Sequence, residues 1–195
     1  LSNTNVGIAY VLYNGTTLVA GPVFGAGGSL SFGVFNTPGS YGVVANPSTP
    51  CATNMAGLAV VSVNPLPTAF SVTGGGNYCS GGSGVHVYLS SSTIGVNYQL
   101  MLGTTPVGAP MAGTSAALDF GFVTTAGTYT VAAVNTATGC ANNMSGSVTV
   151  GIDPLPTAFA VTGGGQYCAG STSTLHVYLS GSVIGTSYQL MLGGV

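Results

Sequence analysis

Asn64-Pro-Leu-Pro-Thr-Ala-Phe70 recurs as Asp153-Pro-Leu-Pro-Thr-Ala-Phe159, 89 residues further along the chain. The run that follows it, Gly74-Gly-Gly-Asn-Tyr-Cys79, recurs at the same offset as Gly163-Gly-Gly-Gln-Tyr-Cys168. Self-similarity at a fixed period is the sequence signature of a repeat architecture. The period of this chain therefore decides how the rest of the sequence is divided.

The remaining motifs extend the repeat in both directions. His86-Val-Tyr-Leu-Ser90 returns as His176-Val-Tyr-Leu-Ser180 with an offset of 90, which indicates one inserted residue. At the start of the chain, Leu1-Ser2 aligns with Leu89-Ser90, and Tyr41 aligns with Tyr129. We expect three copies: a partial one at 1–64 without its first strands, a complete one at 65–153, and a partial one at 154–195 without its later strands.

A period near 90 is too long for one rung of a solenoid and is typical of a self-contained β-sandwich domain. Alternating apolar residues and frequent glycines predict seven strands in the complete copy, and no segment has helical spacing. The strands are expected at about 68–72, 84–90, 95–102, 105–111, 115–122, 127–135 and 145–152. The predicted fold class is all-β, as tandem immunoglobulin-like antiparallel β-sandwich domains.

The alternation also predicts which side chains face the core. Every second apolar residue of each expected strand should point inward. The inward set is Phe70, Val72, Val85, Val87, Leu89, Val96, Tyr98, Leu100, Leu102, Leu118, Phe120, Phe122, Tyr129, Val131, Ala133, Val148, Val150 and Ile152. Tyr129 and Tyr41 also stand near the start of a strand after Ala-Gly or Pro-Gly, which predicts a tyrosine corner in each copy.

The charge count excludes several classes of partner. The 195 residues include no Lys or Arg and only two acidic residues, whereas 46% are hydrophobic. Because binding to nucleic acid or to anionic lipid requires basic residues, neither kind of partner is expected. No apolar run approaches the length of a spanning helix, so direct membrane insertion is not expected either.

Four cysteines at repeated positions predict disulfide bonds, and hence an oxidising compartment. Cys79 bonding Cys140 would close the complete copy, although the loops that carry them normally lie at opposite ends of a sandwich. Alternatively, Cys51 bonds Cys79 and Cys140 bonds Cys168, which staples across each Pro-Leu-Pro segment. The spacing alone does not settle the pairing; we favour the bond within the complete copy over the second pairing and over free buried thiols.

The remaining polar residues do not form a recognisable reactive site. One histidine per copy, His86 or His176, is too few for a metal site, and Asp119 and Asp153 do not form a catalytic carboxylate pair. The three-glycine runs are followed by no Lys and are expected to be turns, not phosphate loops. We therefore expect no enzyme activity, no metal and no cofactor.

Pro65-Leu-Pro67 and Pro154-Leu-Pro156 are predicted to be semi-rigid linkers between the copies, because alternate prolines hold a chain extended. Pro65, Pro67, Pro154 and Pro156 are the linker residues.

The motifs together also resemble a known group. Pro-Leu-Pro-Thr-Ala-Phe, then Val-Thr-Gly-Gly-Gly-x-Tyr-Cys, then Ala-Gly-Thr-Tyr-Thr-Val and Gly-Cys, resemble repeats in giant secreted surface proteins of Bacteroidetes. These include gliding-motility-type adhesins that the type IX system exports. The first copy departs slightly, since Pro50 precedes Cys51. The resemblance implies a long extracellular filament of Ig-like modules on a bacterial cell surface.

The sequence therefore predicts a structural stalk of a cell-surface adhesin, whose partners are neighbouring repeats of the same chain. Two alternatives stay open. The repeats could themselves bind glycan or protein ligands through Tyr13, Tyr78, Tyr88, Tyr167 and Tyr178. Like chains could also assemble laterally into a filament or bundle, because edge strands here lack the charges that normally protect them.

Overall fold

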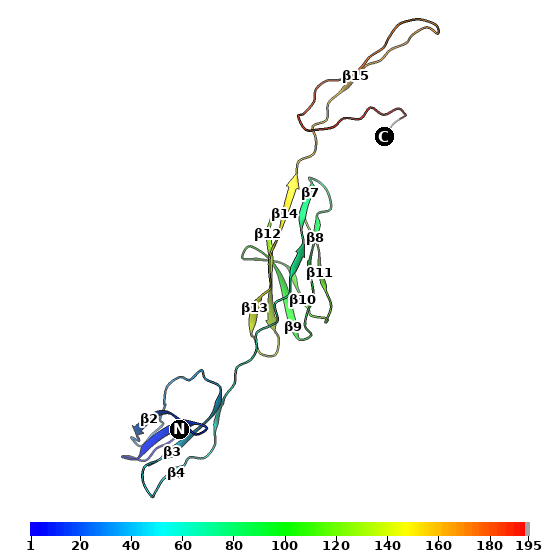
Figure 1. Ribbon diagram of the computed structural model, residues 1–195. Helices are drawn as coiled ribbons and strands as arrows, with labels where there is room; N and C mark the ends of the chain where they lie inside the picture. Colours follow the sequence, from blue (N-terminus) through cyan, green and yellow to red (C-terminus); the bar gives the residue numbers. More distant parts are fainter. Residues whose placement is uncertain (194–195) are drawn as a thin grey trace. The chain divides into compact units, whose positions relative to one another are not determined.

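A computed structural model describes residues 1–193 of the chain, and these residues form β-strands and no helix (Figure 1). The chain divides into two compact units, Leu1–Pro65 and Leu66–Val195. No helix long and apolar enough to cross a membrane occurs among the described residues. The fold is all-β with several antiparallel sheets.

Unit 1 contains one five-stranded antiparallel sheet in which β1 and β3 are central. β2 pairs with β1, β1 with β3, and β3 with both β4 and β5. Its strands are β1 (Ala9–Asn14), β2 (Thr17–Phe24), β3 (Gly39–Ala45), β4 (Thr53–Asn54) and β5 (Ala59–Val61). Tyr10, Val11, Leu12, Tyr41 and Ala45 are its buried hydrophobic residues.

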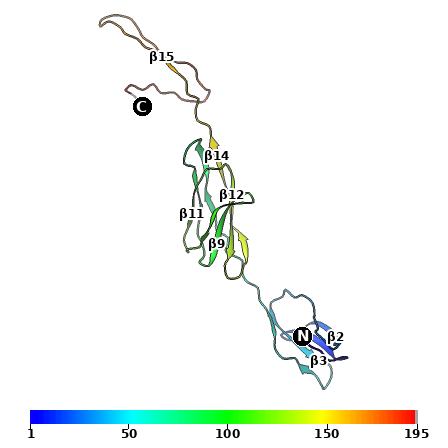
Figure 2. The ribbon, with the colours of Figure 1, turned by 180° about the vertical axis from the view of Figure 1, so that it is seen from behind.

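The complete copy has two sheets over one core. The larger sheet has the order β10-β9-β12-β14-β7, with β13 also paired to β12, and the smaller has the order β11-β8-β6. The strands are β6 (Val72–Gly74), β7 (Gly76–Cys79), β8 (Val85–Leu89), β9 (Val96–Leu102), β10 (Thr105–Ala112), β11 (Leu118–Val123), β12 (Gly127–Asn135), β13 (Ala141–Asn143) and β14 (Val148–Asp153). Figure 2 shows this copy from behind, with β11 and β12 on opposite sides.

The core of the complete copy uses residues from both sheets, all of them between Phe70 and Val150. Val87, Leu89, Tyr98 and Ala133 are fully buried at 0% exposure. Because this core draws on no residue of the flanking copies, the complete copy buries its apolar faces by itself.

Two predicted inward residues face solvent instead. Phe122 is 61% exposed and Ile152 is 44% exposed, whereas Val123 is 5% exposed. The register of β11 against β8 shifts between Asp119 and Phe122, where Gly121 has a φ of +80°. This irregularity moves the inward position by one residue, because side chains alternate strictly along a regular strand.

The strand list also differs from the expected one. The first strand, expected at about 68–72, is β6 at Val72–Gly74, and only a bridge at Ser71 precedes it. The Gly74-Gly-Gly76 run does not simply turn: it carries the chain from β6 in the smaller sheet to β7 in the larger sheet. β7 and the short β13 were not predicted. Both are only three or four residues long, and such lengths show little alternation.

In the C-terminal copy, β15 (Val161–Gly163) pairs antiparallel with β16 (Val177–Leu179). Val161 lies opposite Leu179, and Gly163 opposite Val177. This is the register in which β6 meets β8 in the complete copy, where Val72 lies opposite Leu89. Residues 194 and 195 of this copy lie outside the described residues.

Candidate functional site at the two ends of the complete copy

The chain enters the complete copy beside β13. Pro67 is buried, and its carbonyl oxygen accepts a hydrogen bond of 2.8 Å from Asn142 Nδ2. Further along, Ser145 N donates to Phe70 O, and Ser71 forms a parallel bridge with Ser145. Pro67, predicted to be linker, is therefore packed against the domain that it precedes.

The chain leaves the complete copy beside β7. β14 runs parallel to β7 with Asp153 opposite Cys79, and Ser80 N donates 2.8 Å to Asp153 O. Asn77 Nδ2 donates 3.0 Å to the Asp153 carboxylate. Beyond this point Pro154 and Pro156 are exposed. Asp153 therefore marks the last residue that the larger sheet holds in place.

Cys79 and Cys140 lie at opposite ends of the larger sheet. Val150 pairs with Gly127 at one end of β12, and Cys79 lies three residues beyond, opposite Asp153. At the other end of β12, Asn135 N donates 2.9 Å to Cys140 O. The eight residue steps of β12 alone span about 26 Å.

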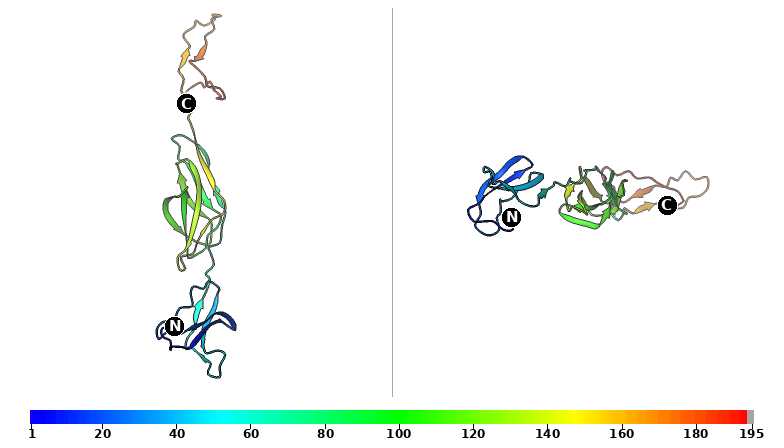
Figure 3. Two further views of the ribbon diagram at one scale, coloured as in Figure 1. Left: turned by 90° about the vertical axis from the view of Figure 1, so that its left-hand side faces the viewer. Right: turned by 90° about the horizontal axis from the view of Figure 1, so that it is seen from below.

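A Cys79–Cys140 disulfide is therefore incompatible with the fold. The Cα atoms of a disulfide lie at most about 7 Å apart. The pairing that would close the complete copy is wrong, and the reason is that the larger sheet separates the two loops along its full length. Figure 3 shows the two ends of this copy, where the chain enters and where the yellow β14 leaves.

The second predicted pairing, Cys51 with Cys79 across Pro65-Leu-Pro67, is also constrained by the fold. Cys51 follows β3 at its Ala45 end, whereas β5 leads out of unit 1 from the Gly39 end of β3. Cys51 and Cys79 therefore each lie at the end of their own copy that is remote from Pro65-Leu-Pro67. A bond between them would need the two copies to lie side by side. Cys51, Cys79 and Cys168 are exposed, and the described residues contain no disulfide.

The two predicted corner tyrosines bond back to their own loops. Tyr41 Oη donates 2.8 Å to Thr37 O, and Tyr129 Oη donates 2.7 Å to Thr125 O. Burial raises the pKa of Tyr129, and the hydrogen bond to Thr125 opposes that shift. Each hydroxyl holds the carbonyl four residues earlier, which is the geometry of a tyrosine corner.

A second repeated tyrosine contact was not predicted. The hydroxyl of Tyr98 accepts 2.9 Å from Thr93 N, and the equivalent Tyr10 and Tyr188 accept 3.0 Å from Asn5 N and Val183 N. The sequence signal was present, since each of these tyrosines follows a turn glycine by three residues. Tyr98 was predicted only as a core residue, and that prediction gave its hydroxyl no role in fixing the turn.

The smaller sheet carries a polar pair on its outer face. His86 Nδ1 lies 2.8 Å and 2.9 Å from the two carboxylate oxygens of Asp119, across β8 and β11. The hydrogen bond from His86 is the main cause that lowers the pKa of Asp119. Burial opposes this shift, and Gly121 N–H and the charge of His86 add to it. The sequence placed both side chains outward but did not bring them together.

Aromatic rings extend this pair into a patch. The His86 ring stacks on Tyr88 at 5.5 Å and meets Phe122 edge-on at 3.9 Å between centroids. We call His86, Tyr88, Asp119 and Phe122 the outer patch. Tyr78, another predicted ligand-binding tyrosine, instead donates its hydroxyl proton to Thr124 O.

Residues 1–193 contain no group of three His, Cys, Asp or Glu side chains that could share a metal ion. Neither a protein-family model nor a curated protein sequence matches the chain.

Proposed function

We propose that this chain is part of an extracellular structural stalk, built from tandem immunoglobulin-like sandwich domains on a bacterial cell surface. The observation that carries the proposal is that the complete copy has its own core and is entered and left at opposite ends. Because the chain enters such a domain at one end and leaves it at the other, successive copies can follow one another end to end.

The tyrosine corners and the two-sheet core support the immunoglobulin-like assignment. The composition suits exposure outside the cell, because a chain without Lys or Arg offers no site to trypsin-like proteases. No step in this role requires catalysis, a metal or a cofactor.

The cysteines fit the same role as links between successive copies. Cys79 lies level with Asp153, the residue before the linker, and Cys140 lies beside the segment that enters through Pro67. Cys79 thus lies near the linker through which the chain leaves the complete copy. The equivalent of Cys140 in the next copy would lie near the same linker. A bond between those two would brace the linker, with both thiols oxidised by exchange with a small disulfide such as oxidised glutathione.

The stalk is tested with proteins that contain one, two and four consecutive copies of residues 65–153. We expect particle length in negative-stain electron microscopy to rise in proportion to copy number. Replacing each Pro-Leu-Pro by Gly-Ser-Gly is the matched control, and it should broaden the distribution of end-to-end distances. Compact particles whose length is independent of copy number would contradict the stalk.

The bond across the linker is tested in the two-copy protein. After oxidation, peptide mapping should join Cys79 of the first copy to the equivalent of Cys140 in the second. Mapping that finds both cysteines of one copy joined to each other would contradict the fold itself.

The outer patch favours a second candidate, direct binding of a sugar ring. Phe122 is 61% exposed and Tyr88 is 39% exposed, and exposed rings are the surfaces on which sugars stack. A glycan array probed with the chain should then give signals that Phe122→Ala removes. An array without signals would dismiss this candidate and leave the stalk untouched.

A further inference from the structure

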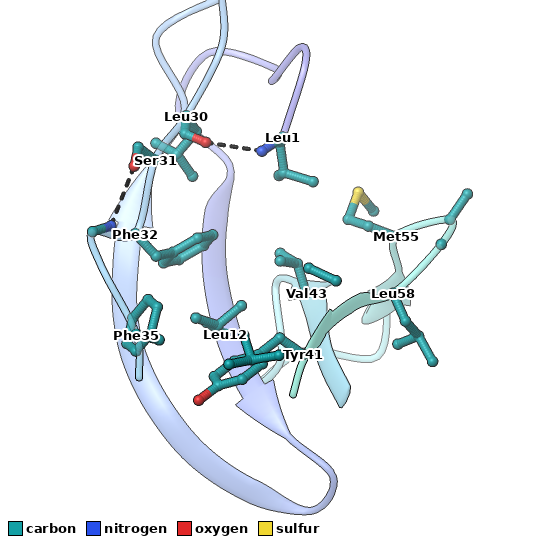
Figure 4. Close-up of a pocket in the computed structure, with 15 residues that line it drawn as sticks. Leu1, Leu12, Leu30, Ser31, Phe32, Phe35, Tyr41, Val43, Met55 and Leu58 are labelled. Carbon is teal, nitrogen blue, oxygen red and sulfur yellow. Dashed lines mark hydrogen bonds between the residues drawn. The ribbon is translucent and has the colours of Figure 1, made fainter. Parts of the chain in front are cut away.

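Unit 1 has a hollow on the outer face of its sheet. Figure 4 shows the inner face, where Leu12 of β1 and Val43 of β3 lie. Because side chains alternate along a strand, Ala9, Val11 and Tyr13 of β1 point to the other face. They form the floor of a hollow of about 340 Å³, which we call the Tyr13 pocket.

Two bends of the chain form the walls of the Tyr13 pocket. On one side β2 contributes Leu18 and Pro22, and its register against β1 shifts twice. On the other side the turn after β3 is held over β1 by Asn46. The Asn46 N–H donates 2.7 Å to Ala9 O, and Asn46 Oδ1 accepts 3.3 Å from Ala9 N. Between these walls Val11 is only 4% exposed, although it lies on the outer face.

Every element around the Tyr13 pocket has a counterpart in the complete copy. β9 corresponds to β1, β10 to β2, and the turn before Cys140 to the turn before Cys51. The smaller sheet of the complete copy packs on the inner face of the larger sheet. β7 lies at the far edge of the larger sheet, separated from β9 by β12 and β14. The counterparts of β6, β7 and β8 would therefore not reach the Tyr13 pocket.

The two copies differ at the residue in the middle of the pocket floor. Val11 has Gln99 as its counterpart, and the Gln99 amide donates 3.0 Å to Val107 O, from β9 across to β10. Gln189 occupies the same position in the C-terminal copy and donates 3.1 Å to Leu190 O. The glutamine of the complete copy thus lies across this surface, whereas the valine of unit 1 leaves a hollow.

The other two floor residues differ as well. Ala9 has Asn97 as its counterpart, and Tyr13 has Met101. The strand pairing is the same in both copies, with Tyr10 opposite Ala45 and Tyr98 opposite Ala133. The differences therefore leave the fold unchanged. They replace two polar side chains by apolar ones and add an aromatic ring.

The Tyr13 pocket is uncharged, and its polar groups are hydroxyls and amides. Residues 1–65 include no acidic or basic side chain and no histidine. Asn46 Nδ2, Ser48 Oγ and Tyr13 Oη, all from residues that line the pocket, form no hydrogen bond with any described residue. A charged ligand would find no opposite charge here and would lose hydration. A ligand with an apolar face and neutral hydroxyls would find partners for both.

We propose that the Tyr13 pocket binds one ring of an uncharged sugar. A pyranose has a face of C–H groups, which would pack on the Tyr13 ring and the apolar floor, and an edge of hydroxyls, which would meet Asn46 and Ser48. Tyrosine combines an apolar face with a polar tip, as this contact requires. The volume of the pocket is near the lower end of the range for small-molecule sites, as expected for a single ring. This inference does not depend on the stalk, and the pocket lies in a different copy from the outer patch.

Saturation-transfer difference NMR of the 195-residue chain with glucose, galactose, mannose and N-acetylglucosamine tests the proposal. We expect transfer to the C–H protons of at least one of these sugars. Tyr13→Ala should weaken that binding at least about tenfold, because it removes the stacking surface. Met101→Ala is the matched control, since it truncates the same position of the complete copy, and binding should be unchanged.

Val11→Gln separates the pocket from the fold. It installs the residue of the complete copy, so the strands should stay paired while the longer side chain lies across the hollow. Binding should then be lost without a lower thermal unfolding midpoint. Phe122→Ala should leave this binding intact, which distinguishes the Tyr13 pocket from the outer patch.

Four results would overturn the proposal. They are the absence of transfer to all four sugars, binding that survives Val11→Gln, equal weakening by Tyr13→Ala and Met101→Ala, and loss of binding with Phe122→Ala alone. Transfer to 4-nitrophenol with none to the sugars would identify a site for an aromatic ring and would also overturn it.

Discussion

Tyrosine hydroxyl groups hold two of the turns of the complete copy through single hydrogen bonds to the backbone. Tyr98 fixes the turn before β9 through Thr93, and Tyr129 fixes the corner before β12 through Thr125. Both rings are at most 1% exposed, so their hydroxyls carry polar contacts into a dry core.

Tyr98→Phe should lower the free energy of unfolding of the complete copy by about 1–2 kcal/mol, since it leaves the Thr93 N–H without its acceptor. Urea unfolding followed by tyrosine fluorescence measures the change. Tyr88→Phe is the control, because its ring is partly exposed and its loss of hydroxyl should cost little. Equal effects of the two substitutions would contradict the assigned role.

Asp119 gives the complete copy a small pH dependence. Its pKa is lowered in the folded state, so the ionised form is favoured by folding. The stabilisation is complete above the ordinary pKa of 3.8 and is lost as the pH falls below that value. Asp119→Asn should remove this part of the decrease in unfolding free energy at acid pH. The difference in unfolding free energy should stay below about 1 kcal/mol, because the pair is exposed. Urea unfolding of the wild type and of Asp119→Asn at pH 2 and pH 6 measures the difference. An equal difference in unfolding free energy at both pH values would contradict this role of Asp119.

At the scale of the elements, Gly74 lets the chain change sheets. It has a φ of +92°, and a Cβ at this position would lie 2.4 Å from His86 O. Left-handed backbone is strained for other residues, and a clash with main-chain oxygen cannot be relieved by a rotamer change. The glycine run is therefore required by the crossing from β6 to β7.

Gly74→Ala should destabilise the complete copy by at least about 2 kcal/mol, the sum of backbone strain and the clash. Gly81→Ala separates the two contributions, since Gly81 has a φ of +82° with open space around it. Its cost should be about 1 kcal/mol. Thermal unfolding of both variants provides the measurement, and a milder effect at Gly74 than at Gly81 would be evidence against the crossing.

At the scale of the whole molecule, each compact unit holds its own buried residues. Leu100 is 1% exposed in the complete copy, and the equivalent Leu12 is 6% exposed and lines a pocket of unit 1. The two leucines therefore have the same place in the repeat but different surroundings.

Leu100→Ala should lower only the unfolding transition of the complete copy, by about 3 kcal/mol. Leu12→Ala should affect only unit 1 and cost less, because Leu12 lines a pocket and is less completely buried than Leu100. Hydrogen exchange read by mass spectrometry can follow both units in one chain. Protection lost in both units after either substitution would show that they unfold together.

Much of the core followed from alternation alone. Val87, Leu89, Leu100 and Val131 were placed inward correctly, since a regular strand repeats its direction every two residues. Phe122 was placed wrongly, because the irregularity at Gly121 depends on how β11 pairs with β8, which local sequence does not encode. The pairing of His86 with Asp119 was missed for the same reason.

The sequence by itself determined the repeat, its period, the all-β class and the near absence of charge, because these are properties of residue order and composition. Tertiary structure alone decided how far apart Cys79 and Cys140 lie and which tyrosine hydroxyls meet which turns. Those features depend on the register between strands that lie far apart in the chain. Register is set by the packing of the whole domain and not by neighbouring residues.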